Sequence, residues 1–335
     1  MSSNGQAPLL DICNFRLAGT IKTDEGPKKM SVWVPAIRSC PGEVTAIIGG
    51  SGCGKSVLLS LIMGYPSFQV EGKAEMGRFR LFNADMPENA FLSYARSDAW
   101  RRNVLRSGGL FYLPQSFPVA RTQLIKTKTV MIQIVQAMAA PTALASSEAA
   151  RRIDETFNEH EMGATLAKPI GSLSGGERRR AELLARLVAM GTAKRPAILV
   201  LDEPTTGFDP ANTHQFVIKV RKEVDHLNEA GVPASALLST HEMKSLDDRI
   251  DEGRSVIDRL CIVHRDADEC VGGEPSICTV VFDGRKDTAL PRLFPKHPDF
   301  ANGQFTRNGE QIFETLRTRP AADWVGMTDK MEERS

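Results

Sequence analysis

The stretch that decides the fold of this chain is Gly49-Gly50-Ser51-Gly52-Cys53-Gly54-Lys55-Ser56. It follows the apolar run 44–48 and precedes the apolar run 57–63, an order that predicts strand, glycine-rich loop and helix. In such a loop, successive backbone N–H groups curl around a phosphate at the start of the helix. Lys55 would reach the β- and γ-phosphates, and the Ser56 hydroxyl would bind Mg²⁺. The pair indicates a nucleoside triphosphate site rather than an ordinary glycine-rich turn.

The composition of the 335-residue chain is that of an ordinary globular protein. Its 42 basic and 41 acidic residues give a formal net charge of +1, so no strong field favours nucleic acid or a membrane surface. Apolar runs are only a few residues long, as at 197–201, far below the roughly 20 residues that cross a bilayer. The first eight residues lack the features of a secretory signal. We expect a cytosolic chain without a membrane span.

Six cysteines occur at positions 13, 40, 53, 261, 270 and 278, and no two of them form a C-x-x-C pair. This pattern is typical of reduced thiols in a reducing compartment. Cys261, Cys270 and Cys278 lie close together in the sequence and leave open a metal or iron–sulfur site. Their spacings are wider than those of most such sites, so the metal is the weaker interpretation.

Hydrophobic patterning predicts alternating strands and helices. The expected strands cover residues 9–17, 30–34, 44–48, 72–82 (a pair), 109–113, 197–201, 234–239 and 259–263. The expected helices cover residues 57–63, 85–106, 127–140, 147–161, 178–190 and 242–256. The first two strands are expected to be antiparallel, with a polar loop over 20–29, and residues 116–172 read as an inserted helical subdomain.

A second glycine-rich segment, Leu173-Ser174-Gly175-Gly176-Glu177, precedes the helix expected over 178–190. A glycine pair at a helix N-terminus suits a second anion site. A serine before a helix is also a common N-cap, so a simple capping role stays open.

The run 197–201 ends in two acids, Asp202 and Glu203, as a buried parallel strand does where its carboxyl end meets a ligand. Asp202 would hold Mg²⁺ through its water shell, and Glu203 would act as general base for an attacking water. A capping role for these acids is the weaker alternative. The strand expected over 234–239 ends at His241, which would contact the γ-phosphate, although a lone histidine is more often structural.

Together these segments resemble the ATPase cassette of ATP-binding cassette (ABC) transporters. Six motifs occur in the family's order over residues 9–265: Walker A at 49–56, a Q-loop at Gln115, the signature at 173–177, Walker B at 198–202, a D-loop at 207–210 and an H-loop at His241. The resemblance implies an α/β P-loop NTPase fold with a mainly parallel RecA-like sheet, an antiparallel β subdomain and an inserted α-helical subdomain. It implies a nucleotide-binding domain over 1–285, followed by an extension of unknown role over 286–335.

The resemblance also implies roles for individual residues. Those expected to take part in catalysis are Lys55, Gln115, Glu203 and His241. Those expected to bind nucleotide are Phe15, Gly49, Gly50, Ser51, Gly52, Cys53, Gly54, Lys55, Ser56 and Val57. Ser56, Gln115 and Asp202 would hold Mg²⁺. Leu173, Ser174, Gly175, Gly176 and Glu177 would bind ATP held by a second cassette, with Asp209 in the D-loop. Phe15 is the aromatic residue nearest the position where the family stacks adenine.

As implied partners and ligands, the resemblance gives ATP, Mg²⁺, a second cassette and separate transmembrane permease subunits, with no nucleic acid. The chain would lie on the cytosolic face of the cell (inner) membrane. Residues 129–134 and 293–298 are similar to oligopeptide-importer ATPases. An alternative from another class is an ABC ATPase that acts in assembly, repair or regulation without a membrane partner.

Overall fold

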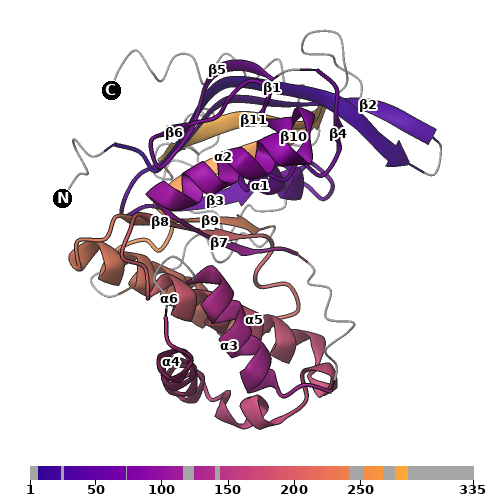
Figure 1. Cartoon of the computed structure of the whole chain (residues 1–335). Coiled ribbons are helices and arrows are strands. Elements are labelled where there is room, and N and C mark those ends of the chain that lie inside the picture. The colour runs from indigo at the N-terminus through magenta and orange to yellow at the C-terminus, as the bar shows by residue number, and fades with distance from the viewer. Residues whose placement is uncertain are drawn as a thin grey trace, which may run out of the picture.

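The computed structural model describes residues 7–23, 26–72, 74–115, 124–139, 144–240, 250, 253–266 and 276–285. Its strands form one continuous sheet in the order β6-β5-β1-β2-β11-β10-β3-β9-β8-β7, and β4 pairs with β1. Figure 1 shows the antiparallel strands on one side of the molecule and most of the helices on the other. The sheet therefore has two halves that differ in strand direction.

The parallel half lies in the middle of the molecule. It consists of β10 (Arg259–Asp266), β3 (Val44–Ile48), β9 (Ala234–Thr240), β8 (Ala197–Leu201) and β7 (Gly109–Leu113). Every residue of β8 is buried. Leu199 and Leu201 belong to one hydrophobic core, whereas Ile198 and Val200 belong to the other. Both faces of this strand are covered, which explains its uninterrupted apolar sequence.

The antiparallel half comprises β1 (Leu10–Thr23), β2 (Gly26–Ser39), β4 (Gln69–Val70), β5 (Glu75–Leu81), β6 (Ala84–Asp85) and β11 (Ser276–Arg285). Among these strands only the β2–β11 pairing is parallel. The expected antiparallel pairing of the first two strands is confirmed, but the polar loop over 20–29 is wrong. Thr20 is paired with Lys29, and Lys22 with Pro27. This end of the ribbon extends past the neighbouring strands (Figure 1), so it needs no apolar face.

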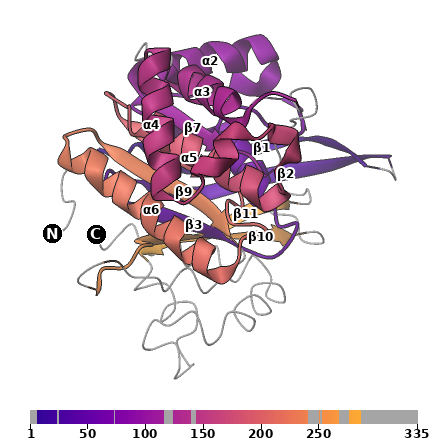
Figure 2. The ribbon, with the colours of Figure 1, turned by 90° about the horizontal axis from the view of Figure 1, so that it is seen from below.

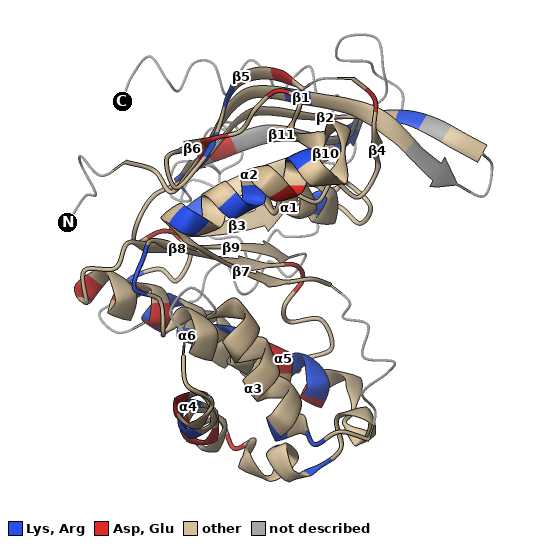
Figure 3. Ribbon diagram, viewed as in Figure 1, with Lys and Arg blue, Asp and Glu red and all other residues tan. Residues whose placement is uncertain are grey.

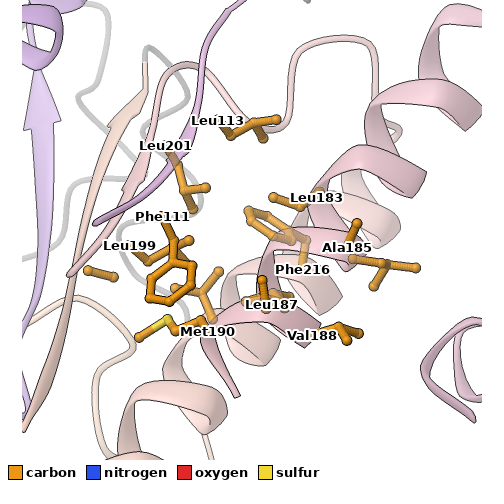
Figure 4. Packing of buried hydrophobic residues seen from close by; sticks show 14 of the residues in the cluster. Phe111, Leu113, Leu183, Ala185, Leu187, Val188, Met190, Leu199, Leu201 and Phe216 are labelled. Carbon is orange, nitrogen blue, oxygen red and sulfur yellow. The ribbon is translucent and has the colours of Figure 1, made fainter. Parts of the chain in front are cut away.

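Helices cover both faces of the sheet. On one face, α1 (Lys55–Ile62) and α2 (Tyr94–Ser107) share a core with β1, β2 and β5. On the other, α3 (Thr127–Met138), α4 (Ser146–Glu159), α5 (Gly175–Met190) and α6 (Pro210–Glu229) share the second core. Figure 2 shows α3, α4 and α6 from the helical side. In Figure 4, Leu183 and Leu187 of α5 pack toward Phe111 of β7 and Leu201 of β8.

Short 3₁₀ helices complete the described chain: η1 (Ala90–Leu92), η3 (Gly163–Ala167) and η4 (Ile170–Ser172). The expected elements at 109–113, 127–140, 147–161, 197–201, 234–239 and 259–263 are confirmed with small shifts of their ends. Helix α5 begins at Gly175, inside the glycine-rich segment. No helix among the described residues is long and apolar enough to cross a membrane.

Two long elements, α6 and β11, are absent from the expectations, as are the two-residue strands β4 and β6. Helix α6 begins at a clear signal, because Asp209 is its N-cap and Pro210 its first residue. The helix expected over 242–256 lies mostly outside the described residues. Its last part, 253–256, is described and is not α-helical, since Gly253 has a left-handed φ of 77°.

Candidate nucleotide-binding site

Three described chain segments leave the carboxyl ends of the parallel strands. The phosphate loop follows β3, Pro114 and Gln115 follow β7, and Asp202 and Glu203 follow β8. Strand β9 ends at Thr240, next to His241, which lies outside the described residues. Because parallel strands end at the same edge of a sheet, the three described segments meet there, which is where ligands bind in open α/β folds.

The phosphate loop has a backbone that depends on glycine. Gly54, the N-cap of α1, has a φ of 91°, and no side chain caps the helix there. At Gly49, a Cβ atom would lie 2.3 Å from the carbonyl oxygen of Val263. Lys55 is buried, and its Nζ donates to the carbonyl oxygens of Gly49 (3.0 Å) and Gly50 (3.2 Å). The lysine therefore curls over its own loop, above uncapped N–H groups that suit a phosphate.

The rest of the loop divides into exposed and buried positions. Ser51 and Gly52 are exposed, whereas Cys53 is buried. Burial raises the pKa of the Cys53 thiol, and Lys55 opposes this effect. Val57 packs against the core shared by α1 and β1. The sulfur is thus part of the loop's packing, and the open side of the loop carries backbone and hydroxyl groups.

The two acids after β8 have different surroundings. Asp202 is only 2% exposed, and its Oδ1 accepts a hydrogen bond from the Ser239 hydroxyl at 2.8 Å. The same hydroxyl accepts from the backbone N–H of Glu203 at 2.8 Å. Glu203 has a φ of 46°, a left-handed value that a non-glycine residue adopts at a cost of about 1–3 kcal/mol. The Glu203 carboxylate contacts Gln115 and Lys55, whereas that of Asp202 contacts Ser239.

Two of the predicted catalytic residues, Gln115 and Lys55, contact a third, Glu203. The Gln115 Nε2 donates to Glu203 Oε2 at 2.9 Å. Lys55 Nζ lies 3.8 Å from Glu203 Oε1. Gln115 and Glu203 lie two residues beyond β7 and β8, and Lys55 begins α1, so the fold brings together residues that are up to 148 positions apart in the printed sequence.

The oxygen donors at this edge fit a magnesium ion. Mg²⁺ prefers carboxylate, hydroxyl and amide oxygens, and Asp202, Ser56 and Gln115 supply one of each. The negative charge of Asp202 also acts on the phenol of Tyr112. Burial is the larger cause and the Asp202 carboxylate the smaller cause of a Tyr112 pKa raised to about 12. Among described side chains, no group of three His, Cys, Asp or Glu residues could hold a metal by itself. A metal at this edge would therefore also need oxygens from its ligand.

Sequence reasoning missed two residues of this edge. Ser239 joins Asp202 to the backbone of Glu203, as described above. Arg179 of α5 is buried, and its guanidinium donates to the carbonyl oxygens of Pro114, Asp202 and Glu203. A serine near the end of a strand and an arginine inside a basic run are weak signals, because both are usually solvated.

The signature segment begins α5 with a capping box. The Ser174 hydroxyl accepts from the N–H of Glu177 at 3.2 Å, and the Glu177 carboxylate accepts from the N–H of Ser174 at 2.9 Å. The bond from Ser174 lowers the pKa of Glu177. Ser174 and Gly175 are exposed, whereas Leu173 is buried. The capping interpretation is confirmed, and the second anion site stays a prediction on an exposed helix start.

Phe15, Asp209 and Cys261 are three further residues that the sequence patterns singled out and whose surroundings the structure describes. Phe15 is wrong as an adenine-stacking residue, because its ring is fully buried and packs edge-on against Phe79 at 5.2 Å. Asp209 caps α6 by accepting from the N–H of Asn212 at 3.0 Å, which lowers the pKa of the aspartate. Cys261 is buried in β10, whereas the side chains of Cys270 and Cys278 lie outside the described residues.

Solved structures with a similar fold are ATPase cassettes. One, described as the ATP binding subunit of an ABC transporter, matches with a TM-score of 0.54 and 17% identity, covering 86% of this chain and 93% of that one. A nucleotide-free ATP-binding cassette from an ABC transporter matches with a TM-score of 0.51 and 16% identity, covering 89% and 98%. At this identity the likeness concerns the fold, and the expected ABC cassette fold is confirmed.

Curated relatives share part of the sequence. A probable ABC transporter ATP-binding protein of Azorhizobium caulinodans is 28% identical over 67% of this chain and 65% of its own length. The oligopeptide transport ATP-binding protein OppD of Mycobacterium bovis is 31% identical over 71% of this chain and 35% of its own length. The chain thus spans less than two thirds of each of these relatives. The family model described as "ABC transporter" matches residues 37–206, just over half of the chain, and the chain therefore belongs to the ABC transporter family.

Proposed function

We propose that this chain is an ATP-binding and ATP-hydrolysing subunit of an ABC transporter, which drives separate transmembrane permease subunits from the cytosolic face of the membrane. The observation that carries the proposal is the contact of Lys55, Gln115 and Glu203 at one sheet edge. Membership of the ABC transporter family supports it. The names of the relatives differ in cargo, oligopeptide for one and sn-glycerol-3-phosphate for another, so we assign no cargo.

ATP would bind with its phosphates over the phosphate loop. The uncapped N–H groups at the start of α1 favour negative charge, and the helix dipole adds to this preference. Lys55 Nζ, which donates to two carbonyls of its own loop, would exchange them for phosphate oxygens. A hydrogen bond to a charged oxygen is stronger than one to a neutral carbonyl, so this exchange is favourable.

Ser56, Asp202 and Gln115 would hold Mg²⁺ together with the phosphates. When bound, the ion neutralises charge that develops on the phosphate oxygens. The Ser239 hydroxyl fixes one oxygen of Asp202. A carboxylate held in this way needs little reorganisation, which is the property that electrostatic stabilisation requires.

Hydrolysis requires a water molecule in line with the γ-phosphate and a base that accepts its proton. Glu203 is the proposed base, and its Oε2 accepts from the Gln115 amide. The Gln115 Nε2–H would orient the Glu203 carboxylate, and the Gln115 amide oxygen would bind Mg²⁺. His241, on the resemblance, would contact the γ-phosphate. The left-handed backbone of Glu203 supports a functional role, because strain of this kind is concentrated at active sites.

Two chains would close around two ATP molecules. Leu173, Ser174, Gly175, Gly176 and Glu177 would then contact the γ-phosphate in the partner site, and Asp209 would lie at the same interface. The exposed start of α5 supports this part of the proposal. Closure would be favoured by contacts to the γ-phosphate and lost after hydrolysis, since a ligand shifts an equilibrium only through differential affinity.

The proposed division into domains follows the resemblance to ABC cassettes. Residues 1–285 would form the nucleotide-binding domain, and residues 116–172 its helical subdomain. The inclusion of α3, α4, η3 and η4 between β7 and α5 supports the second boundary. The extension over 286–335 lies outside the described residues.

The proposal is tested by recovering the partner. Glu203→Gln is expected to keep ATP bound, so the tagged variant is incubated with Mg²⁺ and ATP in detergent-solubilised membranes of its source organism. Recovery of a multi-span membrane protein in equal amount, dependent on ATP and lost with Lys55→Ala, is the expected result. Recovery of only soluble partners would contradict a transporter role and favour the alternative of an ABC ATPase without a membrane partner.

A further inference from the structure

Helix α5 carries two arginines on its buried face. Arg179 is 8% exposed and Arg186 is 1% exposed. They are seven residues apart, which places them about two turns apart on the same side of the helix. Glu182, also buried, lies between them on that side and balances part of their charge. Burying a guanidinium is costly unless its donors find acceptors, so the partners of each arginine indicate what it does.

The acceptors of Arg179 belong to the two strand ends that carry the candidate catalytic residues. Its guanidinium donates to the carbonyl oxygen of Pro114, directly before Gln115. It also donates to the carbonyl oxygens of Asp202, at 2.5 Å, and Glu203, at 3.3 Å. One planar group therefore connects the end of β7 to the end of β8. Desolvation lowers the pKa of Arg179, and the carboxylates around it oppose this change.

Arg186 has equivalent burial and chemistry but different acceptors. Its Nε donates to the carbonyl oxygen of Tyr112 at 2.8 Å, and its NH1 donates to the carbonyl of Glu182 at 2.6 Å. The first acceptor lies inside β7 and the second inside α5 itself. These contacts fasten the helix to the sheet without touching Asp202 or Glu203. Arg186 is thus a matched internal reference for Arg179.

We propose that Arg179 is a positioning residue for ATP hydrolysis, which holds the backbone of Pro114, Asp202 and Glu203 so that Gln115 and the two acids keep their mutual geometry. This inference rests on the proposed ATPase function. Arg179 touches none of the reacting atoms and acts through the three carbonyls. The two strand ends are otherwise joined near this point by the backbone bond from Asp202 N–H to Leu113 O at 2.9 Å. The hydrogen bond from Gln115 to Glu203 joins them through side chains, and the arginine adds a charged connection between their backbones.

The geometry explains why an arginine suits this position. A guanidinium presents several donors in a fixed plane, so it can contact carbonyls from two chain segments at once, whereas a lysine ammonium acts as a point charge. The strained backbone of Glu203 needs surrounding contacts to persist. Arg179 also lies four residues after Gly175, so the helix start that carries the signature is rigidly connected to the strand ends.

The test compares Arg179→Met with Arg186→Met in the full chain. Four quantities are measured on each variant and on the wild type: melting temperature, ATP affinity by calorimetry, kcat from phosphate release, and the Mg²⁺ concentration for half-maximal rate. For Arg179→Met we expect kcat to fall about 10- to 100-fold, because small displacements of catalytic groups are costly. The Mg²⁺ requirement should rise several-fold and ATP affinity should change less than about threefold. For Arg186→Met we expect a similar loss of melting temperature with kcat within about threefold of the wild type.

Equal losses of kcat in the two variants, or an unchanged kcat and Mg²⁺ requirement in Arg179→Met, would overturn the inference. If Arg179→Met does not fold, the pair Arg179→Lys and Arg186→Lys decides in the same way, with only the first expected to raise the Mg²⁺ requirement. A well-folded wild type without ATPase activity would instead overturn the proposed function, and the inference with it.

Discussion

The two halves of the sheet use charge in opposite ways. In the antiparallel half, charged side chains pair across neighbouring strands: Asp11 of β1 contacts Arg38 of β2 (3.1 Å) and Arg78 of β5 (2.6 Å). In the parallel half, the central strands β3, β7, β8 and β9 contain no charged residue, and Asp202 and Glu203 stand just beyond the carboxyl end of β8. Figure 3 shows the uncoloured central strands β7, β8 and β9 between more highly charged neighbours. Charge inside a sheet stabilises pairing, whereas charge at the shared edge of parallel strands is available to a ligand.

The largest expected effect separates stability from activity in the two halves. Leu201→Ala in β8 and Phe79→Ala in β5 each remove a fully buried side chain, and each should cost about 2–5 kcal/mol of unfolding free energy. Only Leu201 directly precedes Asp202, so only this variant should also lower the kcat of the folded fraction. Urea unfolding and phosphate release measure the two quantities. Equal kcat values for the two variants would remove the distinction between the halves.

Next in size is the loss of Lys55. Lys55→Ala removes charged hydrogen bonds worth about 1.5–3 kcal/mol, so ATP binding should weaken roughly 10- to 100-fold. The control is Lys194→Ala, which changes an exposed lysine in the segment before β8, at the opposite edge of the parallel strands. Calorimetric titration with ATP measures both. The same loss of affinity in Lys194→Ala would argue for a general charge effect and against the phosphate loop.

A smaller effect is expected from Ser239→Ala. This change removes the hydroxyl that joins Asp202 Oδ1 to the N–H of Glu203, so kcat should fall about tenfold, or 1.4 kcal/mol, with a higher Mg²⁺ requirement. Ser235→Ala is the matched control, because Ser235 is buried on the same strand toward its other end. Identical kinetics for the two alanine variants would show that Ser239 only fills space.

The smallest effect concerns pH. The Tyr112 pKa is raised to about 12, chiefly by burial, so the folded state binds the phenolic proton more tightly than the unfolded state. The contribution of this raised pKa to the unfolding free energy is fully present below about pH 10 and is lost as the pH rises through 12. The loss is about 1 kcal/mol after allowance for the partial exposure of Tyr112. The unfolding free energy of Tyr112→Phe should therefore fall less than that of the wild type between pH 9 and pH 11. Parallel curves would contradict the raised pKa.

The sequence predicted secondary structure best where a single physical cause, the burial of both faces of a strand, determines the residue types. The runs 44–48 and 197–201 are apolar because both strand faces are buried, so their position and direction could be predicted. The paired segments 20–23 and 26–29 were mistaken for a loop, because cross-strand pairing stabilises them without an apolar pattern. Strand β11 was missed although it pairs with β10, the strand directly before it, and its other partner, β2, lies far earlier in the chain.

The residues of the candidate site also fall into two groups, those that local sequence patterns predicted and those that only the fold reveals. Lys55, Asp202 and Glu203 stand in local patterns that carry their own chemical meaning, and the structure brings Lys55 and Glu203 together. Ser239 and Arg179 have no such pattern, and their roles come only from the hydrogen-bond partners that the fold places beside them. Phe15 was assigned by its distance along the chain, but strand alternation turns its ring into the core.

The substitution Glu203→Gln decides whether the carboxyl ends of the parallel strands form an ATP-hydrolysing site. ATP affinity and steady-state phosphate release are measured for the wild type and for Glu203→Gln at saturating Mg²⁺. We expect ATP binding within about threefold of the wild type and a rate lower by about 10²–10⁴-fold, the contribution of a general base. Wild-type turnover in Glu203→Gln would contradict this expectation.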